Sequence, residues 1–194
     1  DESPVNCWTN HQSFVEYKGQ WYLFYHHNDY SPKFDKNRSI RVDSLSFNAD
    51  GTIRKVTPTL RGVGASLATH KIEIDRYSSK SETGSSIALL DSVNTFNGWK
   101  TILNDKNAWV QYNTVDFGKQ KLKAVQLRAL SEKGATLEIR LDIVNGPVVA
   151  EIKVPKSADW NTVEAKVSKF QAGIHNLIVV LKDSPVEIDW VQFQ

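Results

Sequence analysis

The stretch Leu137-Glu-Ile-Arg-Leu-Asp142 alternates apolar and charged residues. Side chains in a strand point to opposite faces in turn, so the pattern predicts a strand with one buried face and one solvated face. Strands of this kind belong to antiparallel sheets that cover a core on one side. The stretch therefore indicates a sheet protein with an aliphatic core.

Other short apolar segments surround this strand at near-regular spacing, and turn-forming residues separate them. We predict further strands at 71–75, 86–91, 108–112, 122–129, 148–154, 162–167, 173–182 and 186–193. No segment has a convincing amphipathic helix pattern. Many short strands at this spacing are typical of a β-sandwich, and the predicted fold class is all-β.

The first part of the chain contains a separate group of predicted strands. A hairpin is expected over 13–26 with its turn at Lys18-Gly19, and a strand over 39–47. Asp50-Gly51 is a strong turn signal before a fourth predicted strand at 53–56. The glycine-rich stretch 61–66 is typical of a linker. We therefore expect units at 1–64 and 72–194, joined by a linker at 65–71.

Composition and charge exclude several classes of partner. The 24 basic and 22 acidic residues give a net charge of +2, which does not favour nucleic acid. No apolar run approaches the ~20 residues that a membrane span needs. Cys7 is the single cysteine, so no internal disulfide is expected. The aromatic residues suit both a sheet protein and sugar binding, and composition does not decide between them.

The second unit resembles family 6 carbohydrate-binding modules. The resemblance lies in five fragments in the family's order, at 72–77, 108–118, 137–142, 173–177 and 188–193. It implies a jelly-roll-like β-sandwich with a structural calcium ion held by Glu73, Asp75 and Asp189. Calcium prefers hard oxygen ligands such as carboxylates. The alternative is that these three are exposed carboxylates at strand ends.

The same resemblance implies a sugar cleft with two aromatic rings and an asparagine. Trp160, in Ala158-Asp-Trp-Asn161, matches one aromatic residue, and Trp99 lies in the loop that supplies the other. The family's asparagine falls near Glu187, which is a departure from the pattern. The alternative for both tryptophans is that they cap the core. Trp109 and Tyr112 match positions that pack inside the sandwich.

The first unit resembles the last propeller blade of family 43 glycoside hydrolases. The resemblance covers 5–64 and is strongest in Asn10-His-Gln12 and at 38–43. It implies that His11 is the family's central histidine and that Arg38 lies in a segment near the substrate pocket. The parent enzymes act on arabinose- and xylose-containing plant polysaccharides, and several carry a family 6 module behind the propeller.

Hydrolysis is not expected from this chain alone. Glycosidases need a pair of placed carboxylates, and the resemblance assigns the essential acids to earlier blades. Glu16 and Asp43 alternate with apolar residues, and we expect both to be solvated.

Three functions follow from these predictions. The chain binds xylan or arabinoxylan-type polysaccharide as the C-terminal part of a glycoside hydrolase. Alternatively, it is a fragment of a family 43 arabinofuranosidase or xylosidase that works only with the missing blades as its partner. The third possibility is that the chain is a structural sandwich without a working cleft. A secreted, periplasmic or cell-surface location is expected in each case.

Overall fold

The chain divides into two units, Asp1–Val63 and Gly64–Gln194, in a computed structural model. The structure describes residues 11–27, 38–119, 121–168, 170 and 172–194. The division falls inside the predicted glycine-rich stretch. Part of the predicted linker, Ser66–Leu67, forms the short strand β4. Within the described ranges, no helix has the length and apolar character needed to cross a membrane.

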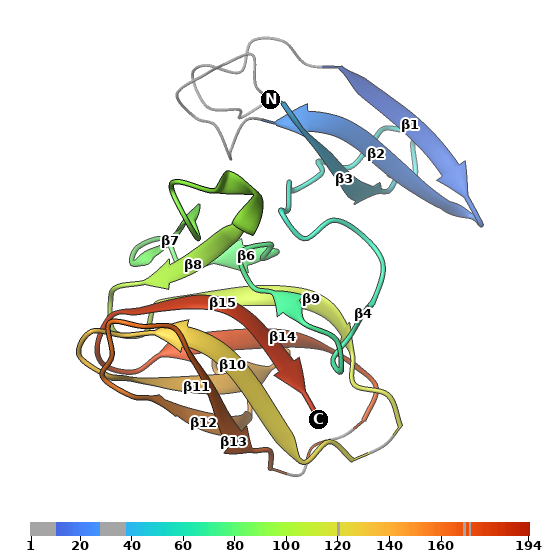
Figure 1. Cartoon of the computed structure of the whole chain (residues 1–194). Helices are drawn as coiled ribbons and strands as arrows, with labels where there is room; N and C mark the ends of the chain where they lie inside the picture. The colour runs from blue at the N-terminus through green and yellow to red at the C-terminus, as the bar shows by residue number, and fades with distance from the viewer. Residues whose placement is uncertain (1–10, 28–37, 120, 169, 171) are drawn as a thin grey trace. The chain divides into compact units, whose positions relative to one another are not determined.

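The second unit is a β-sandwich of two six-stranded sheets, which confirms the predicted fold class (Figure 1). The first, here called the β15 sheet, has the order β13-β10-β15-β8-β7, and β5 also pairs with β15. Its strands are β5 (Ile72–Glu73), β7 (Ser85–Leu89), β8 (Trp99–Leu103), β10 (Ala124–Leu130), β13 (Asn161–Lys166) and β15 (Val186–Phe193).

The other sheet, here called the β14 sheet, has the order β12-β11-β14-β9-β4, and β6 also pairs with β9. Its further strands are β6 (Ser79–Lys80), β9 (Trp109–Asp116), β11 (Ala135–Leu141), β12 (Val148–Val154) and β14 (Ile174–Leu181). A 3-10 turn, η1 (Thr95–Asn97), lies between β7 and β8.

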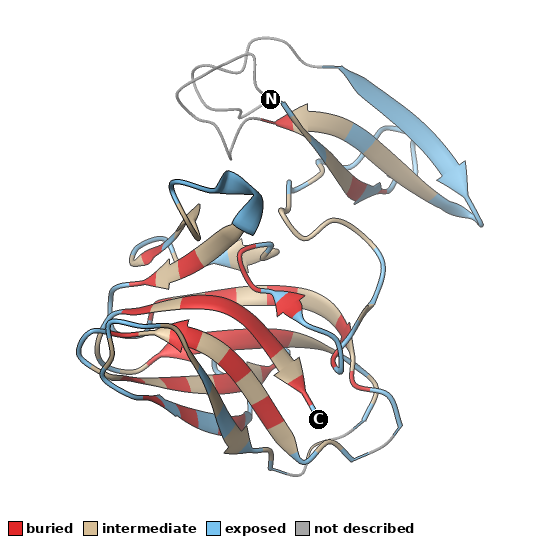
Figure 2. Ribbon diagram, viewed as in Figure 1, coloured by how far each residue is buried: buried red, intermediate tan, exposed pale blue. Residues whose placement is uncertain are grey.

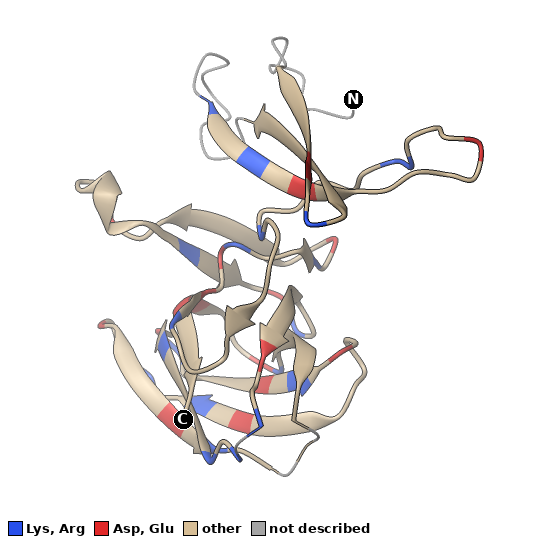
Figure 3. Cartoon of the chain, turned by 90° about the vertical axis from the view of Figure 1, so that its right-hand side faces the viewer, with Lys and Arg blue, Asp and Glu red and all other residues tan. Residues whose placement is uncertain are grey.

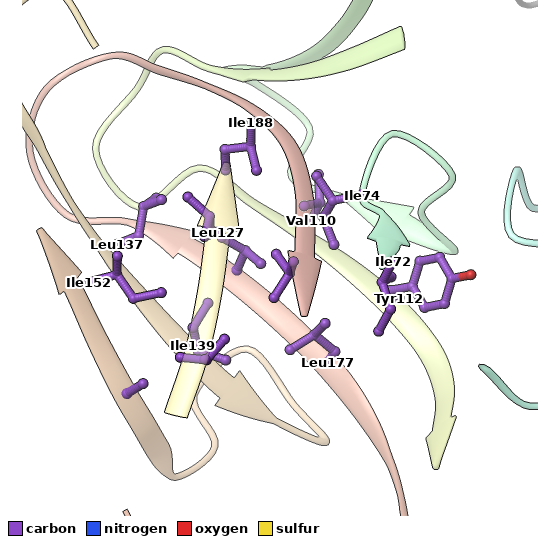
Figure 4. Packing of buried hydrophobic residues seen from close by; sticks show 14 of the residues in the cluster. Ile72, Ile74, Val110, Tyr112, Leu127, Leu137, Ile139, Ile152, Leu177 and Ile188 are labelled. Carbon is purple, nitrogen blue, oxygen red and sulfur yellow. The ribbon is translucent and has the colours of Figure 1, made fainter. Parts of the chain in front are cut away.

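The core lies between the two sheets. Aliphatic side chains from both sheets meet there, among them Leu127 and Ile188 from the β15 sheet and Leu137 and Ile139 from the β14 sheet (Figure 4). All four are fully buried. Burial of one such side chain contributes about 1.5–3 kcal/mol, so these alternating strands supply the main driving force for the fold. Residues 137–141 lie in β11 with the predicted alternation, whereas Asp142 follows the strand with a positive φ.

A bulge in β15 turns an acidic residue out of the core. Leu127 pairs with Val191, but Ala129 pairs with Ile188, so β15 carries one extra residue between these pairs. Ile188 and Val191 both belong to the core although they are three positions apart. Bulges redirect side chains in this way, and here Asp189 reaches the outer face of the β15 sheet.

The first unit contains a three-stranded antiparallel sheet, ordered β1 (Gln12–Tyr17), β2 (Gln20–His27) and β3 (Ser39–Leu45). The predicted turn is present, with positive φ at Lys18 and Gly19, as a two-residue hairpin loop of type I′ requires. The fourth predicted strand is wrong, because only the isolated bridge Phe47↔Ile53 forms there. Its apolar residues, Ile53 and Val56, are three apart and cannot share a strand face.

Surface character differs between the strands of the two units. Every residue of β1 is exposed, whereas β10 and β11 show the alternating burial of a sandwich and β15 is buried along most of its length (Figure 2). Basic and acidic residues are interspersed along the described ribbon (Figure 3). Arg128 and Glu187 on the β15 sheet, and Glu138 and Arg140 on β11, are outward-facing examples of this mixture.

Candidate functional site

The outer face of the β15 sheet carries a row of aromatic and charged side chains. Arg128 lies on β10 and faces outward, because its neighbours Leu127 and Ala129 are fully buried on the other side. Trp160 directly precedes β13, the neighbouring edge strand. The guanidinium carbon of Arg128 lies 4.9 Å from the centre of the Trp160 ring. This contact has the geometry of a cation–π interaction.

Trp160 and Glu187 lie at the same end of this sheet. Asn161, which follows Trp160, pairs with Ala129, and the next residue of β10, Leu130, pairs with Glu187. Neighbouring strands are about 4.8 Å apart, so Trp160 and Glu187 stand about two strands, or roughly 10 Å, apart. The structure thus brings together two of the three predicted sugar-binding residues.

Glu187 is held by a lysine that sequence reasoning did not single out. Lys100 on β8 donates from Nζ to Glu187 Oε2 at 2.7 Å, and both side chains are partly exposed. A carboxylate accepts several hydrogen bonds, so the pair still leaves Glu187 able to accept from a sugar hydroxyl. The asparagine expected from the family would offer a donor as well.

Trp99 is not brought to this face. It begins strand β8 rather than lying in a loop, and its backbone pairs with Leu89. Alternation along β8 places Trp99 on the side of the buried residues Thr101 and Leu103, whereas Lys100 points to the outer face. Trp99 and Trp160 therefore do not form two walls of one cleft on the outer face.

Trp109 was expected in the core, and this prediction is wrong. Tyr112 is buried in the core cluster, as expected (Figure 4). Trp109 is only partly buried and alternates with the core residue Val110 on β9, so its ring faces away from the core. One strand cannot place Trp109 and Tyr112, three positions apart, on the same face without a bulge.

The three predicted calcium ligands lie at the junction of β5 and β15. Glu73 pairs with Trp190, and the amide of Ile74 donates to the Asp189 carbonyl at 3.3 Å. Burial raises the pKa of Glu73, and the negative charges of Asp189 and Asp75 raise it further. Burial also raises the pKa of Asp75. The three carboxylates thus share one region of negative potential.

The donor set suits a hard cation, but its side chains do not converge. Carboxylates are the ligands that calcium prefers, and a divalent cation would relieve the repulsion between them. In the part of the chain that the structure describes, no three His, Cys, Asp or Glu side chains gather closely enough to count as a metal cluster. One oxygen of Asp189 accepts a hydrogen bond from Arg128 Nη1.

Asp43 in the first unit was expected to be solvated, and this prediction is wrong. Asp43 is buried and accepts hydrogen bonds from Tyr25 Oη and Thr59 Oγ1, each at 2.6 Å. Burial and the Asp43 carboxylate raise the pKa of the Tyr25 phenol. Thr59 is distant in sequence, so strand alternation did not reveal that it covers Asp43. Glu16 is exposed, as expected.

The predicted pocket residues of the parent enzyme lie at the edges of this small sheet. His11 precedes β1, and its amide donates to His26 Nδ1 at 3.4 Å. The rings of the two histidines are 5.9 Å apart. Arg38 is exposed and directly precedes β3.

Comparison with known proteins places this geometry in a family. The model of the carbohydrate binding module (family 6) matches residues 69–194, the sandwich with all of its site residues. The chain belongs to this family. A family 6 module from Clostridium cellulolyticum, solved in complex with xylose, is 27% identical and aligns with 66% of this chain and 98% of its own, with a TM-score of 0.58.

Two further proteins are similar to both units. An arabinoxylan arabinofuranohydrolase of Paenibacillus polymyxa is 25% identical over 90% of this chain and 29% of its own length. The crystal structure of a family 43 arabinoxylan arabinofuranohydrolase from Bacillus subtilis, in complex with cellotetraose, covers 96% of this chain and 41% of its own, at 22% identity and a TM-score of 0.67. The predicted resemblance to a family 43 hydrolase with a family 6 module is confirmed. The chain spans less than half of these relatives.

Proposed function

We propose that the family 6 module binds xylan or arabinoxylan-type polysaccharide on the outer face of the β15 sheet. The observation that carries the proposal is the position of Trp160, which is partly exposed and lies at the same end of the sheet as Glu187. An indole provides a flat apolar surface for the C–H face of a sugar ring at low entropic cost. Glu187 supplies an acceptor for a hydroxyl group at the same end of the sheet.

The xylose complex of a related module supports xylose-containing chains as the ligand class. The similarity to arabinoxylan arabinofuranohydrolases supports the same class. Cellotetraose in the Bacillus subtilis structure makes β-glucan the ligand to compare against.

Calorimetric titration with xylohexaose, cellohexaose and soluble arabinoxylan tests the proposal. Trp160→Ala should weaken binding of xylohexaose at least tenfold, or about 1.4 kcal/mol, because it removes the stacking surface. Trp99→Ala should leave affinity within about twofold, because its ring lies on the other side of β8. Wild-type affinity in Trp160→Ala would refute the site. If none of these sugars binds at millimolar concentration, the result would favour a structural sandwich. In that case the Lys100–Glu187 ion pair occupies the position proposed for the sugar.

A second proposal concerns the longer protein. The similarity of both units to arabinofuranohydrolases supports a role as the C-terminal part of a family 43 hydrolase, with the module holding the enzyme on its polysaccharide. Work on such a substrate implies a location outside the cytoplasm. The coding sequence upstream tests this idea, since it should encode the earlier propeller blades and their acids.

We also propose that the carboxylates Glu73, Asp75 and Asp189 bind a structural calcium ion. The support is chemical: the oxygens are hard ligands, and burial and mutual repulsion raise the pKa of two of the three groups. A bound ion would connect β5 to β15 at the point along β15 where its pairing with β8 ends and its pairing with β5 begins.

A further inference from the structure

We propose that Arg128 is a positioning residue that holds the Trp160 ring in the orientation needed for sugar stacking. The inference rests on the proposed function of Trp160, and it adds a residue that the resemblance to the family did not indicate. Arg128 links three neighbouring strands of the β15 sheet: it belongs to β10, contacts the residue before β13 and donates to Asp189 on β15.

Trp160 needs such support because strand pairing does not fix its ring. The register between β10 and β13 ends at the pair Ala129↔Asn161, one residue after Trp160. Two hydrogen bonds order the loop before it, from the Asp159 amide to Ser157 Oγ at 2.9 Å and from Asn161 Nδ2 to the Asp159 carbonyl at 2.8 Å. These bonds fix the backbone, whereas the contact with Arg128 acts on the indole itself.

The guanidinium is itself held from the opposite side. Arg128 Nη1 donates to Asp189 Oδ2, and the Asp189 side chain is only 10% exposed. The bulge in β15 turns this carboxylate to the outer face, directly toward β10. A planar guanidinium can donate with one edge and stack with its face at the same time, which the point charge of a lysine cannot do.

This arrangement gives the indole one supported face. Arg128 lies against that face, so the opposite face is the one available to a sugar ring. An indole that is already oriented loses less freedom when the ligand binds, and such preorganisation raises affinity. Arg128 therefore acts on the ligand through Trp160 and not by direct contact.

A double-mutant cycle on the whole chain tests this role. Arg128→Met keeps the apolar stem and should weaken xylohexaose binding about fivefold, in the range of a partly exposed cation–π contact. Arg128→Lys should restore only part of the affinity, because it keeps the charge beside Asp189 but not the flat stacking surface. Gln126→Met is the matched control, since Gln126 lies on the same strand and face and bonds to Glu164 instead. Its affinity should be that of the wild type.

The cycle closes with Arg128→Met in the Trp160→Ala background. If Arg128 acts through the ring, the double variant should bind xylohexaose as weakly as Trp160→Ala alone. A further fivefold loss in the double variant would overturn the proposal, because it would show that Arg128 acts independently. Wild-type affinity in Arg128→Met would overturn it as well.

A spectroscopic readout separates this inference from the proposed function. The indole Nε1–H resonance of Trp160 can be assigned in a nitrogen-15 spectrum by its loss in Trp160→Ala. It should shift in Arg128→Met and stay in place in Gln126→Met, with or without sugar. If Trp160→Ala binds sugar normally, the proposed site is wrong, and the spectrum still decides whether Arg128 orients the ring. An unchanged resonance in Arg128→Met would refute the positioning role.

Discussion

At the scale of single residues, Asp189 stands between one positively charged side chain and two negatively charged ones. Its carboxylate accepts from Arg128 on one side and lies near Glu73 and Asp75 on the other. The same side chain thus supports the Trp160 platform and belongs to the proposed calcium site. Burial raises the pKa of the other two carboxylates, although the positive charge of Arg76 acts on both of them.

We predict that calcium raises the thermal stability of the protein and that EDTA lowers it. An ion that binds only the folded state at 100 times its Kd contributes about 2.7 kcal/mol. In Asp75→Asn the response to calcium should shrink or disappear, while Glu164→Gln, a carboxylate on the edge strand β13, should respond as the wild type. Melting curves in calcium and in EDTA measure this. Identical melting temperatures in both would contradict the calcium proposal.

Sequence reasoning found part of the candidate site and missed the rest for a physical reason. Trp160 and Glu187 were predicted from their positions in a family pattern, and the structure places both on one face. Arg128 and Lys100 were not predicted, because a charged residue on the solvent side of a strand has no local feature that shows its partner. The outward position of Arg128 follows from the alternation in 122–129, but its contact with Trp160 depends on how β10 and β13 pair.

At the scale of elements, the charged outer face of β11 carries a second linked cluster. Glu138 accepts from Arg140 Nε at 2.8 Å and lies 3.2 Å from Lys182 Nζ. Burial alone would raise the pKa of Glu138, but the hydrogen bonds and charges of Arg140 and Lys182 outweigh it, so this pKa lies below its usual range.

A depressed carboxyl pKa predicts a particular pH dependence. The stabilisation by Glu138 is present above its unfolded pKa of about 4.3 and is lost as the pH falls through the folded value. Glu138→Gln should therefore lower the free energy of unfolding at pH 7 by on the order of 1 kcal/mol, with solvent screening limiting the effect. The difference from the wild type should shrink as the pH falls from 7 to 3, as denaturant titrations at both pH values can measure. The exposed Glu132→Gln is the control, and a difference of the same size at pH 3 and pH 7 would contradict the ionic explanation.

Most strands of the sandwich were predictable because they are short apolar segments separated by turn-forming residues. The predicted bounds 148–154 and 186–193 agree with β12 and β15. Strand β8 was missed because Trp99-Lys-Thr-Ile-Leu103 follows a turn-rich segment and places its polar Thr101 on the buried side. The short strands β4 and β6 were missed because two residues show no periodicity, and their pairing with β9 depends on tertiary structure.

At the scale of the whole molecule, the first unit leaves apolar side chains in solvent. Phe14 is 47% exposed, Tyr17 60% and Ile40 85%. Strand β1 also lies at the edge of its sheet. An edge strand with exposed apolar residues favours pairing with another chain.

We therefore predict that the whole chain associates with itself at high concentration and that residues 64–194 alone stay monomeric. Size-exclusion chromatography with light scattering over a concentration series measures both. A second whole-chain sample with Phe14→Ser and Tyr17→Ser should associate less, because the apolar edge is reduced. A whole chain that remains monomeric throughout the series would contradict the prediction.

The position of β15 has a consequence for biosynthesis. It is the last strand of the sandwich along the chain, yet it lies in the interior of its sheet, with β10 on one side and β8 and β5 on the other. During translation the earlier strands emerge first, at about 5–20 residues per second, and wait with an unfilled gap between β10 and β8. The sandwich can close only after β15 has left the ribosome. The folding of the sandwich is therefore timed by the release of β15 and not by that of the earlier strands.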